Sequence, residues 1–129
     1  MRTYVLVAAI GTLITLLGVQ LAMGQSEDVR KIMRQKLSYA QAILEGVTTE
    51  DYKKITDSAE AMLALTHRAE WNTIDRPEYL GFSMELRRAL EGLADSAKRR
   101  SADGVAYDYV QMTMACVSCH RFVRGLKKA

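Results

Sequence analysis

Five residues near the C-terminal end of the chain carry its clearest chemistry: Cys116, Val117, Ser118, Cys119 and His120. Cys-x-x-Cys-His is the pattern at which c-type haem is attached. On a helix the two cysteines and the histidine occupy positions i, i+3 and i+4, so their side chains share one face. Two thiols can then bond the haem vinyl groups while the imidazole of His120 binds the iron as its proximal ligand. The motif predicts one covalently bound haem c per chain.

Three other uses of these residues stay open at this point. The two cysteines can form a disulfide in a bundle without haem, or serve as a redox Cys-x-x-Cys pair, which is usually found beside a βαβ pattern that this sequence lacks. A zinc site needs a fourth ligand, which only His67 or a carboxylate can supply. No paired carboxylates, Ser/His/Asp set or phosphate loop stands out, so we expect no enzyme activity.

The N-terminus reads as a targeting segment. Arg2 precedes an apolar run from Val5 to Leu17, and small residues stand at Ala22 and Gly24. We expect an export signal over residues 1–24 and one domain over 25–129, with the protein in the periplasm. The alternative is an uncleaved anchor that holds the domain at a membrane, because the apolar run is nearly long enough to span one. The formal net charge of +3 indicates no nucleic-acid binding.

Downstream of this segment, apolar residues recur at helical spacing in four blocks, which predict an all-α, antiparallel four-helix bundle. The first block covers Glu27 to Glu45 and ends at Gly46. The second covers Glu50 to Arg68, and Thr48 followed by Asp51 resembles a capping box at its start. The expected buried stripe of the first block consists of Val29, Ile32, Met33, Leu37, Ala40, Ile43, Leu44 and Val47.

The third and fourth blocks follow an irregular connection that holds Trp71. Pro77 stands at a first-turn position, and the third helix ends in the basic run that starts at Lys98. The fourth block is capped by Asp103 and ends at Gly125. It places the two cysteines and His120 on the stripe that faces the bundle, where such proteins build their cofactor sites.

Four helices behind an export signal, with Cys-x-x-Cys-His in the last helix, resemble the class II cytochromes c, the cytochrome c′ family. In that family an Arg four residues after the proximal His lies near the haem, and Arg124 occupies this position here. The resemblance also implies that the first helix supplies whatever faces the other side of the iron. One branch places a methionine there and carries electrons, and the other leaves the site open to gases.

Within the first block, Met33 is the candidate sixth ligand of the iron, and its thioether would raise the reduction potential. Arg30, Arg34 and Lys36 are candidates to bind the haem propionates, with the two arginines preferred. His67 is expected to be exposed and not to bind iron.

The sequence therefore predicts a periplasmic protein that carries single electrons through its haem and exchanges them with a redox partner protein. The alternative is a five-coordinate haem module that binds or senses a gas such as nitric oxide. A homodimer is left open. The family resemblance implies pairing through the first two helices, for which Tyr39 and Leu44 are the candidates.

Overall fold

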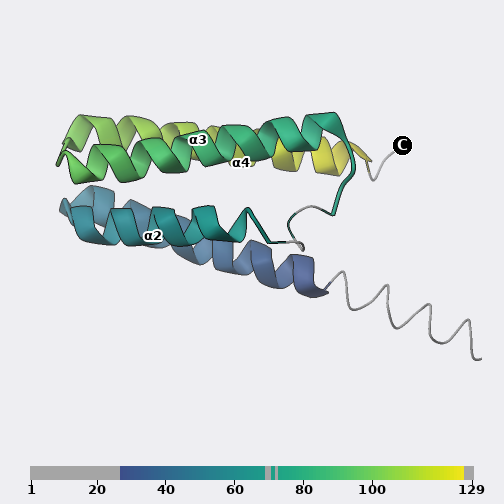
Figure 1. Ribbon diagram of the computed structural model, residues 1–129, viewed down its shortest axis with the longest axis horizontal. Helices are drawn as coiled ribbons and strands as arrows, with labels where there is room; N and C mark the ends of the chain where they lie inside the picture. Colours follow the sequence, from purple (N-terminus) through teal and green to yellow (C-terminus); the bar gives the residue numbers. More distant parts are fainter. Residues whose placement is uncertain (1–26, 69–70, 72, 127–129) are drawn as a thin grey trace, which may run out of the picture.

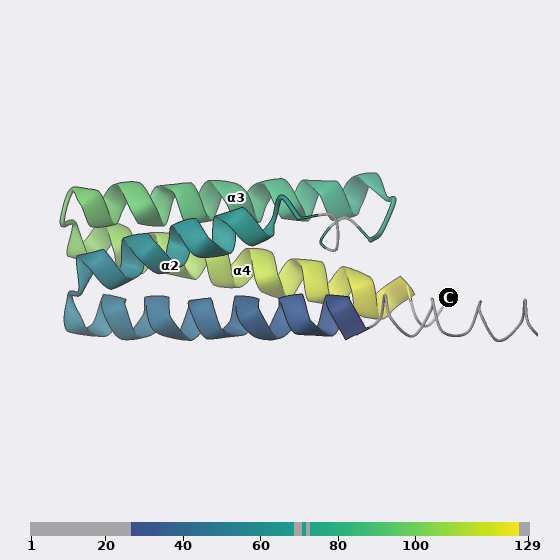
Figure 2. The same ribbon diagram turned by 60° about the horizontal axis from the view of Figure 1, so that its bottom comes forward.

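The protein was analysed as a computed structural model that describes residues 27–68, 71 and 73–126. In this part of the chain the regular structure is entirely helical. A first helix covers residues 27–49, and it is followed by α2 (Tyr52–Leu65), α3 (Pro77–Lys98) and α4 (Ala102–Leu126). Consecutive helices run in opposite directions (Figures 1 and 2), so the predicted antiparallel four-helix bundle is confirmed for the described residues.

The expected signal segment, residues 1–24, lies outside the described residues. Among the helices of the described residues, none combines the length and the apolar character that a membrane span requires.

The core is built mainly from side chains that lie on the inward stripes of α2, α3 and α4. Burying an aliphatic side chain of this size contributes about 1.5–3 kcal/mol each, so these residues dominate the stability of the bundle. The fully buried members are Ile55, Met62, Leu90 and Leu93, together with Leu86, Val105 and Met112 at no more than 2% exposure. α3 packs against both α2 and α4.

The first helix is rotated about its axis relative to the predicted stripe. Ile32 and Ile43 are buried as expected, but Leu37 and Leu44 are 59% and 44% exposed. Lys36 takes the inward position between the two isoleucines and is only 6% exposed. A lysine can lie there because its four methylenes pack like an apolar side chain.

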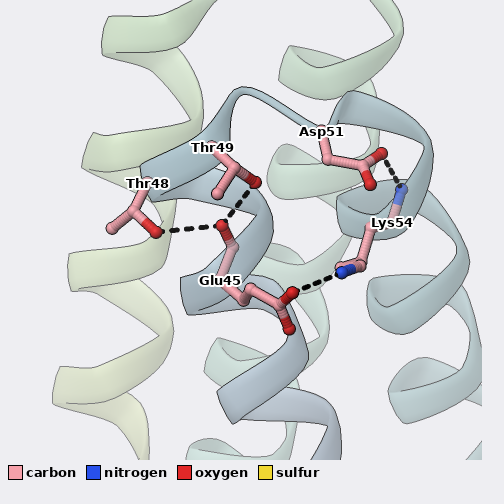
Figure 3. Close-up of polar contacts among 5 residues, drawn as sticks. All are labelled: Glu45, Thr48, Thr49, Asp51 and Lys54. Atoms are coloured by element: carbon pink, nitrogen blue, oxygen red, sulfur yellow. Dashed lines mark hydrogen bonds and ion pairs between the residues drawn. The ribbon is translucent and has the colours of Figure 1, made fainter.

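The turn between the first helix and α2 is held by side chains (Figure 3). The hydroxyls of Thr48 and Thr49 donate to the carbonyl oxygen of Glu45 at 2.9 and 2.8 Å. Asp51 is the N-cap of α2 and accepts from the Lys54 backbone N–H at 3.0 Å, whereas the predicted capping box had Thr48 in that position. The ammonium of Lys54 is 2.6 Å from the Glu45 carboxylate, which ties the two helices together.

Gly46 does not end the first helix, contrary to the prediction, because the helix continues to residue 49. A Cβ atom at Gly46 would lie 2.7 Å from Cγ1 of Ile55 on α2. The glycine therefore allows the two helices to approach closely, a packing role that is distinct from helix termination.

The ends of α2, α3 and α4 agree only partly with the helix ends predicted from the sequence. Pro77 opens α3 as predicted. α4 is capped by Ser101, whose hydroxyl accepts from the Gly104 N–H at 3.2 Å, and not by Asp103, which lies in the first turn. The second helix is shorter than predicted and ends at Leu65.

Two polar contacts fix how α3 meets its neighbours. The guanidinium of Arg87 donates to the hydroxyl and the carbonyl oxygen of Thr66 at 2.8 and 2.7 Å, which closes the C-terminal end of α2. The hydroxyl of Ser96 donates to Asp108 on α4 at 2.7 Å. These bonds set the relative position of the helices that surround the cysteine motif.

Candidate functional site

The Cys-x-x-Cys-His motif lies in the C-terminal half of α4 on an uninterrupted helix. Cys116 and Cys119 are free thiols, half-buried and packed against the core. His120 was predicted to lie within the buried stripe. It is exposed instead and lies at the margin of that stripe. The i, i+3, i+4 arrangement places both thiols on the inner side of the helix, with the imidazole beside them at the edge.

Four elements meet around Cys119: the first helix, the connection between α2 and α3, the start of α3, and α4. Trp71 of the connection is buried, and its indole N–H donates to Ser83 on α3 at 2.9 Å. The hydroxyl of Tyr79 donates to the carbonyl oxygen of Trp71 at 2.5 Å. Lys36 approaches from the first helix, and its Nζ is 4.8 Å from the centre of the Trp71 ring. All four elements come together at one end of the bundle (Figures 1 and 2).

Lys36 is the unusual residue of this group because its side chain is only 6% exposed, although its ammonium is not fully enclosed. The face of the Trp71 ring attracts the ammonium. Among the residues that the structure describes, no carboxylate pairs with Lys36. A cation taken out of water without an anion is costly. A negatively charged group beside the motif would therefore be stabilised by the ammonium of Lys36.

The titratable groups of the motif are shifted towards their uncharged forms. Burial raises the pKa of the Cys119 thiol, with the charge of Lys36 acting in the opposite direction. Burial lowers the pKa of His120, and the positive charges of Lys36 and Arg124 lower it further. Burial, with a smaller contribution from Cys119, raises the pKa of Tyr79 to about 12. Lys36 thus lies close enough to act electrostatically on both Cys119 and His120.

The other predicted site residues are distributed on both sides of this group. Met33 is half-buried and packs against the core, one turn before Lys36. Arg30, Arg34 and Arg124 are exposed, and His67 is exposed as predicted. Of the three basic residues considered for the propionates, Lys36 is the buried one. Its spacing of four from Ile32 and seven from Ile43 was the sequence signal for this inward position.

The residues present fit a covalently attached haem. The thiols are free, they share the inner side of one helix, and Lys36 lies beside them, largely buried and without a carboxylate partner among the described residues. Haem needs two thiols and a histidine for attachment and carries two propionates that a cation can pair with. Within residues 27–68, 71 and 73–126, no group of three or more His, Cys, Asp or Glu side chains is arranged to hold a metal ion by itself.

Comparison of the chain with protein families, curated proteins and solved structures found no match. The functional argument therefore depends on the motif and its surroundings in the bundle.

Proposed function

We propose that this protein is an exported c-type cytochrome that carries single electrons through one covalently bound haem. The observation that supports this most strongly is the position of Lys36. It is buried beside a free Cys-x-x-Cys-His motif and has no carboxylate partner among the described residues. A disulfide would give no reason to bury a cation there. In a thiol redox pair Lys36 would stabilise the thiolate, but burial outweighs it and leaves the pKa of Cys119 raised, whereas a haem propionate would pair with the cation directly.

In this proposal, Cys116 and Cys119 would hold the haem through two covalent thioether bonds. His120 provides the proximal nitrogen. Bound haem supplies a one-electron couple, and the bundle fixes its ligands and limits the water around it. The aromatic side chains of Trp71 and Tyr79, both buried, keep water away from this end of the bundle.

Met33 on the first helix would provide the sixth ligand of the iron in this proposal. Its half-buried position on the core-facing side of the helix is compatible with this role. Lys36 binds a propionate through a charge-assisted hydrogen bond. The protein acts in the periplasm, where it exchanges electrons with a redox partner protein. Arg121 and Arg124, both exposed near the motif, offer a basic surface for this contact.

The first test is haem content. The chain is expressed in a host that exports it and attaches haem, and its mass is measured after denaturation. We expect the mass of one haem on the wild type and none on Cys116→Ser/Cys119→Ser. No added mass on the wild type would contradict the proposal.

The second test concerns the sixth ligand. A ferric spectrum with a weak thioether-to-iron band at the red edge, lost in Met33→Ala, supports electron transfer by a six-coordinate haem. Met84→Ala on α3 is the matched control because Met84 is exposed, and the band is expected to persist there. A high-spin wild type at neutral pH would contradict ligation by Met33 and favour the gas-binding alternative.

A further inference from the structure

The outer face of α4 carries an apolar stripe that no described element covers. Tyr107, Val110, Met114 and Val117 are 64%, 56%, 55% and 41% exposed. Their spacings of three, four and three residues are those of a coiled-coil seam, so the four side chains form one line along the helix. They lie opposite the stripe of Val105, Met112 and Ala115 that faces the core. A continuous apolar line of this kind on a soluble bundle is typical of a contact surface.

Opposite charges stand at the two ends of this stripe in the same spacing. Asp103 lies four residues before Tyr107, and Arg121 lies four residues after Val117. Both are exposed. We call the line from Asp103 to Arg121 the α4 seam. At 1.5 Å per residue it is about 27 Å long.

The seam is self-complementary when a second copy is placed antiparallel to it. Suppose that the two-fold axis passes at the level of position 112. A residue a given number of positions before 112 in one copy then meets the residue the same number of positions after 112 in the second copy. Val110 then meets Met114 of the second copy, and Tyr107 meets Val117. Asp103 meets Arg121 at both ends, so the dimer contains two ion pairs. A two-fold axis of this kind is the commonest symmetry of protein dimers.

Charge decides between this arrangement and the parallel one. In a parallel dimer Asp103 would face Asp103 and Arg121 would face Arg121, and like charges in such positions repel. Within the seam the flanking residues are small or uncharged: Ala106, Gln111, Thr113 and Ser118. Just beyond its ends the antiparallel arrangement places Arg100 at the level of Arg124, so the ion pairs between Asp103 and Arg121 must outweigh this repulsion. On the first helix, by contrast, the exposed Leu37 and Leu44 are separated by the exposed polar Gln41, so no continuous line forms.

We propose that two copies of this chain associate through their α4 seams, antiparallel, with Asp103 of each paired to Arg121 of the other. The contact is narrow compared with the roughly 1,200–2,000 Å² of a stable interface, so the dimer dissociates on dilution. It leaves the inner face of α4, with Cys116 and Cys119, free for the bundle. The inference does not depend on haem.

A charge-exchange experiment tests the pairing. Sedimentation equilibrium on the full chain, purified from an exporting host, is expected to show a concentration-dependent dimer. Asp103→Arg and Arg121→Asp should each raise its dissociation constant about tenfold or more, because every ion pair becomes a repulsion. The double variant should return towards the wild-type value. Each single substitution also changes the charge near one end of the α4 dipole, and the double variant carries both of these changes. A recovery of the dimer dissociation constant in the double variant can therefore come only from restored pairing.

The apolar part of the seam has its own control. Val110→Asp should abolish the dimer over the same concentrations, whereas Met84→Asp should not, because Met84 is an equally exposed methionine on α3. Circular dichroism checks that each variant is folded. A monomeric wild type at all concentrations, a dimer that survives Val110→Asp, or a double variant no stronger than the single ones would overturn the proposal.

Discussion

Lys36 shows how one residue links the fold to its proposed chemistry. It occupies an inward position between Ile32 and Ile43 that an apolar side chain would fill with less cost. Its ammonium contacts the face of Trp71, which returns up to about 2 kcal/mol where the contact is desolvated. Removing a cation from water costs several kcal/mol after relaxation. A residue that is unfavourable for the bundle alone is expected to serve what the bundle binds.

Lys36→Met should therefore have opposite effects in the two forms of the protein. Without haem, we expect the free energy of unfolding to rise by about 1 kcal/mol, because a side chain of similar length replaces a buried charge. With haem attached, the gain should disappear or reverse, because a propionate loses its partner. Urea unfolding of Cys116→Ser/Cys119→Ser and of the haem-bearing protein, each with and without Lys36→Met, measures this.

Lys31→Met is the matched control for this comparison. Lys31 is an exposed lysine on the same helix, and its substitution should change the free energy of unfolding by less than about 0.5 kcal/mol in either form. If Lys36→Met acts alike with and without haem, the pairing of Lys36 with a propionate is wrong.

At the scale of helices, Gly46 and Gly81 make opposite predictions for the same substitution. A methyl group at Gly46 would lie 2.7 Å from Cγ1 of Ile55, so Gly46→Ala must push two packed helices apart. We expect a loss of about 1–3 kcal/mol in the free energy of unfolding. At Gly81 on α3 nothing lies within 4 Å of such a methyl group, and Gly81→Ala should gain up to about 1 kcal/mol from helix propensity. Urea titration of both variants decides, and stabilisation by both would show that the close contact at Gly46 is unimportant.

Features that depend on neighbouring residues were predicted well from the sequence. The four helices and the start of α3 at Pro77 follow from apolar spacing and from residues that favour helix ends. The spacing of the motif on α4 belongs to this class too. The resemblance to class II cytochromes c remains a prediction.

Features that depend on the rest of the fold were not predicted. The direction in which the first helix faces is set by what its neighbours bury. The apolar pattern alone placed Leu37 inside, and the two arginines were preferred over Lys36 as partners of the propionates. The structure exposes Leu37 and buries Lys36. The role of Gly46 was missed for the same reason, because Ile55 is nine residues away in the sequence and in contact only in space.

For the whole molecule, the core and the candidate haem site can be separated. The fully buried residues include Ile55, Met62, Leu90 and Leu93, which lie on α2 and α3, two helices that do not carry the motif. Haem would instead connect α4 with the first helix, at the end of the bundle where Trp71 is hydrogen-bonded to Ser83 and Tyr79 of α3. The bundle should therefore form by itself, and haem should stabilise it afterwards.

This separation predicts the behaviour of the protein without haem. Cys116→Ser/Cys119→Ser should show the helical circular dichroism of the wild type and unfold in one cooperative transition, because its apolar core is unchanged. The haem-bearing wild type should melt at a higher temperature, since a group held by α4 and contacted by the first helix favours the folded state over the unfolded one. Thermal unfolding followed by circular dichroism compares the two. A double variant without helical signal would contradict the separation and would mean that haem takes part in forming the core.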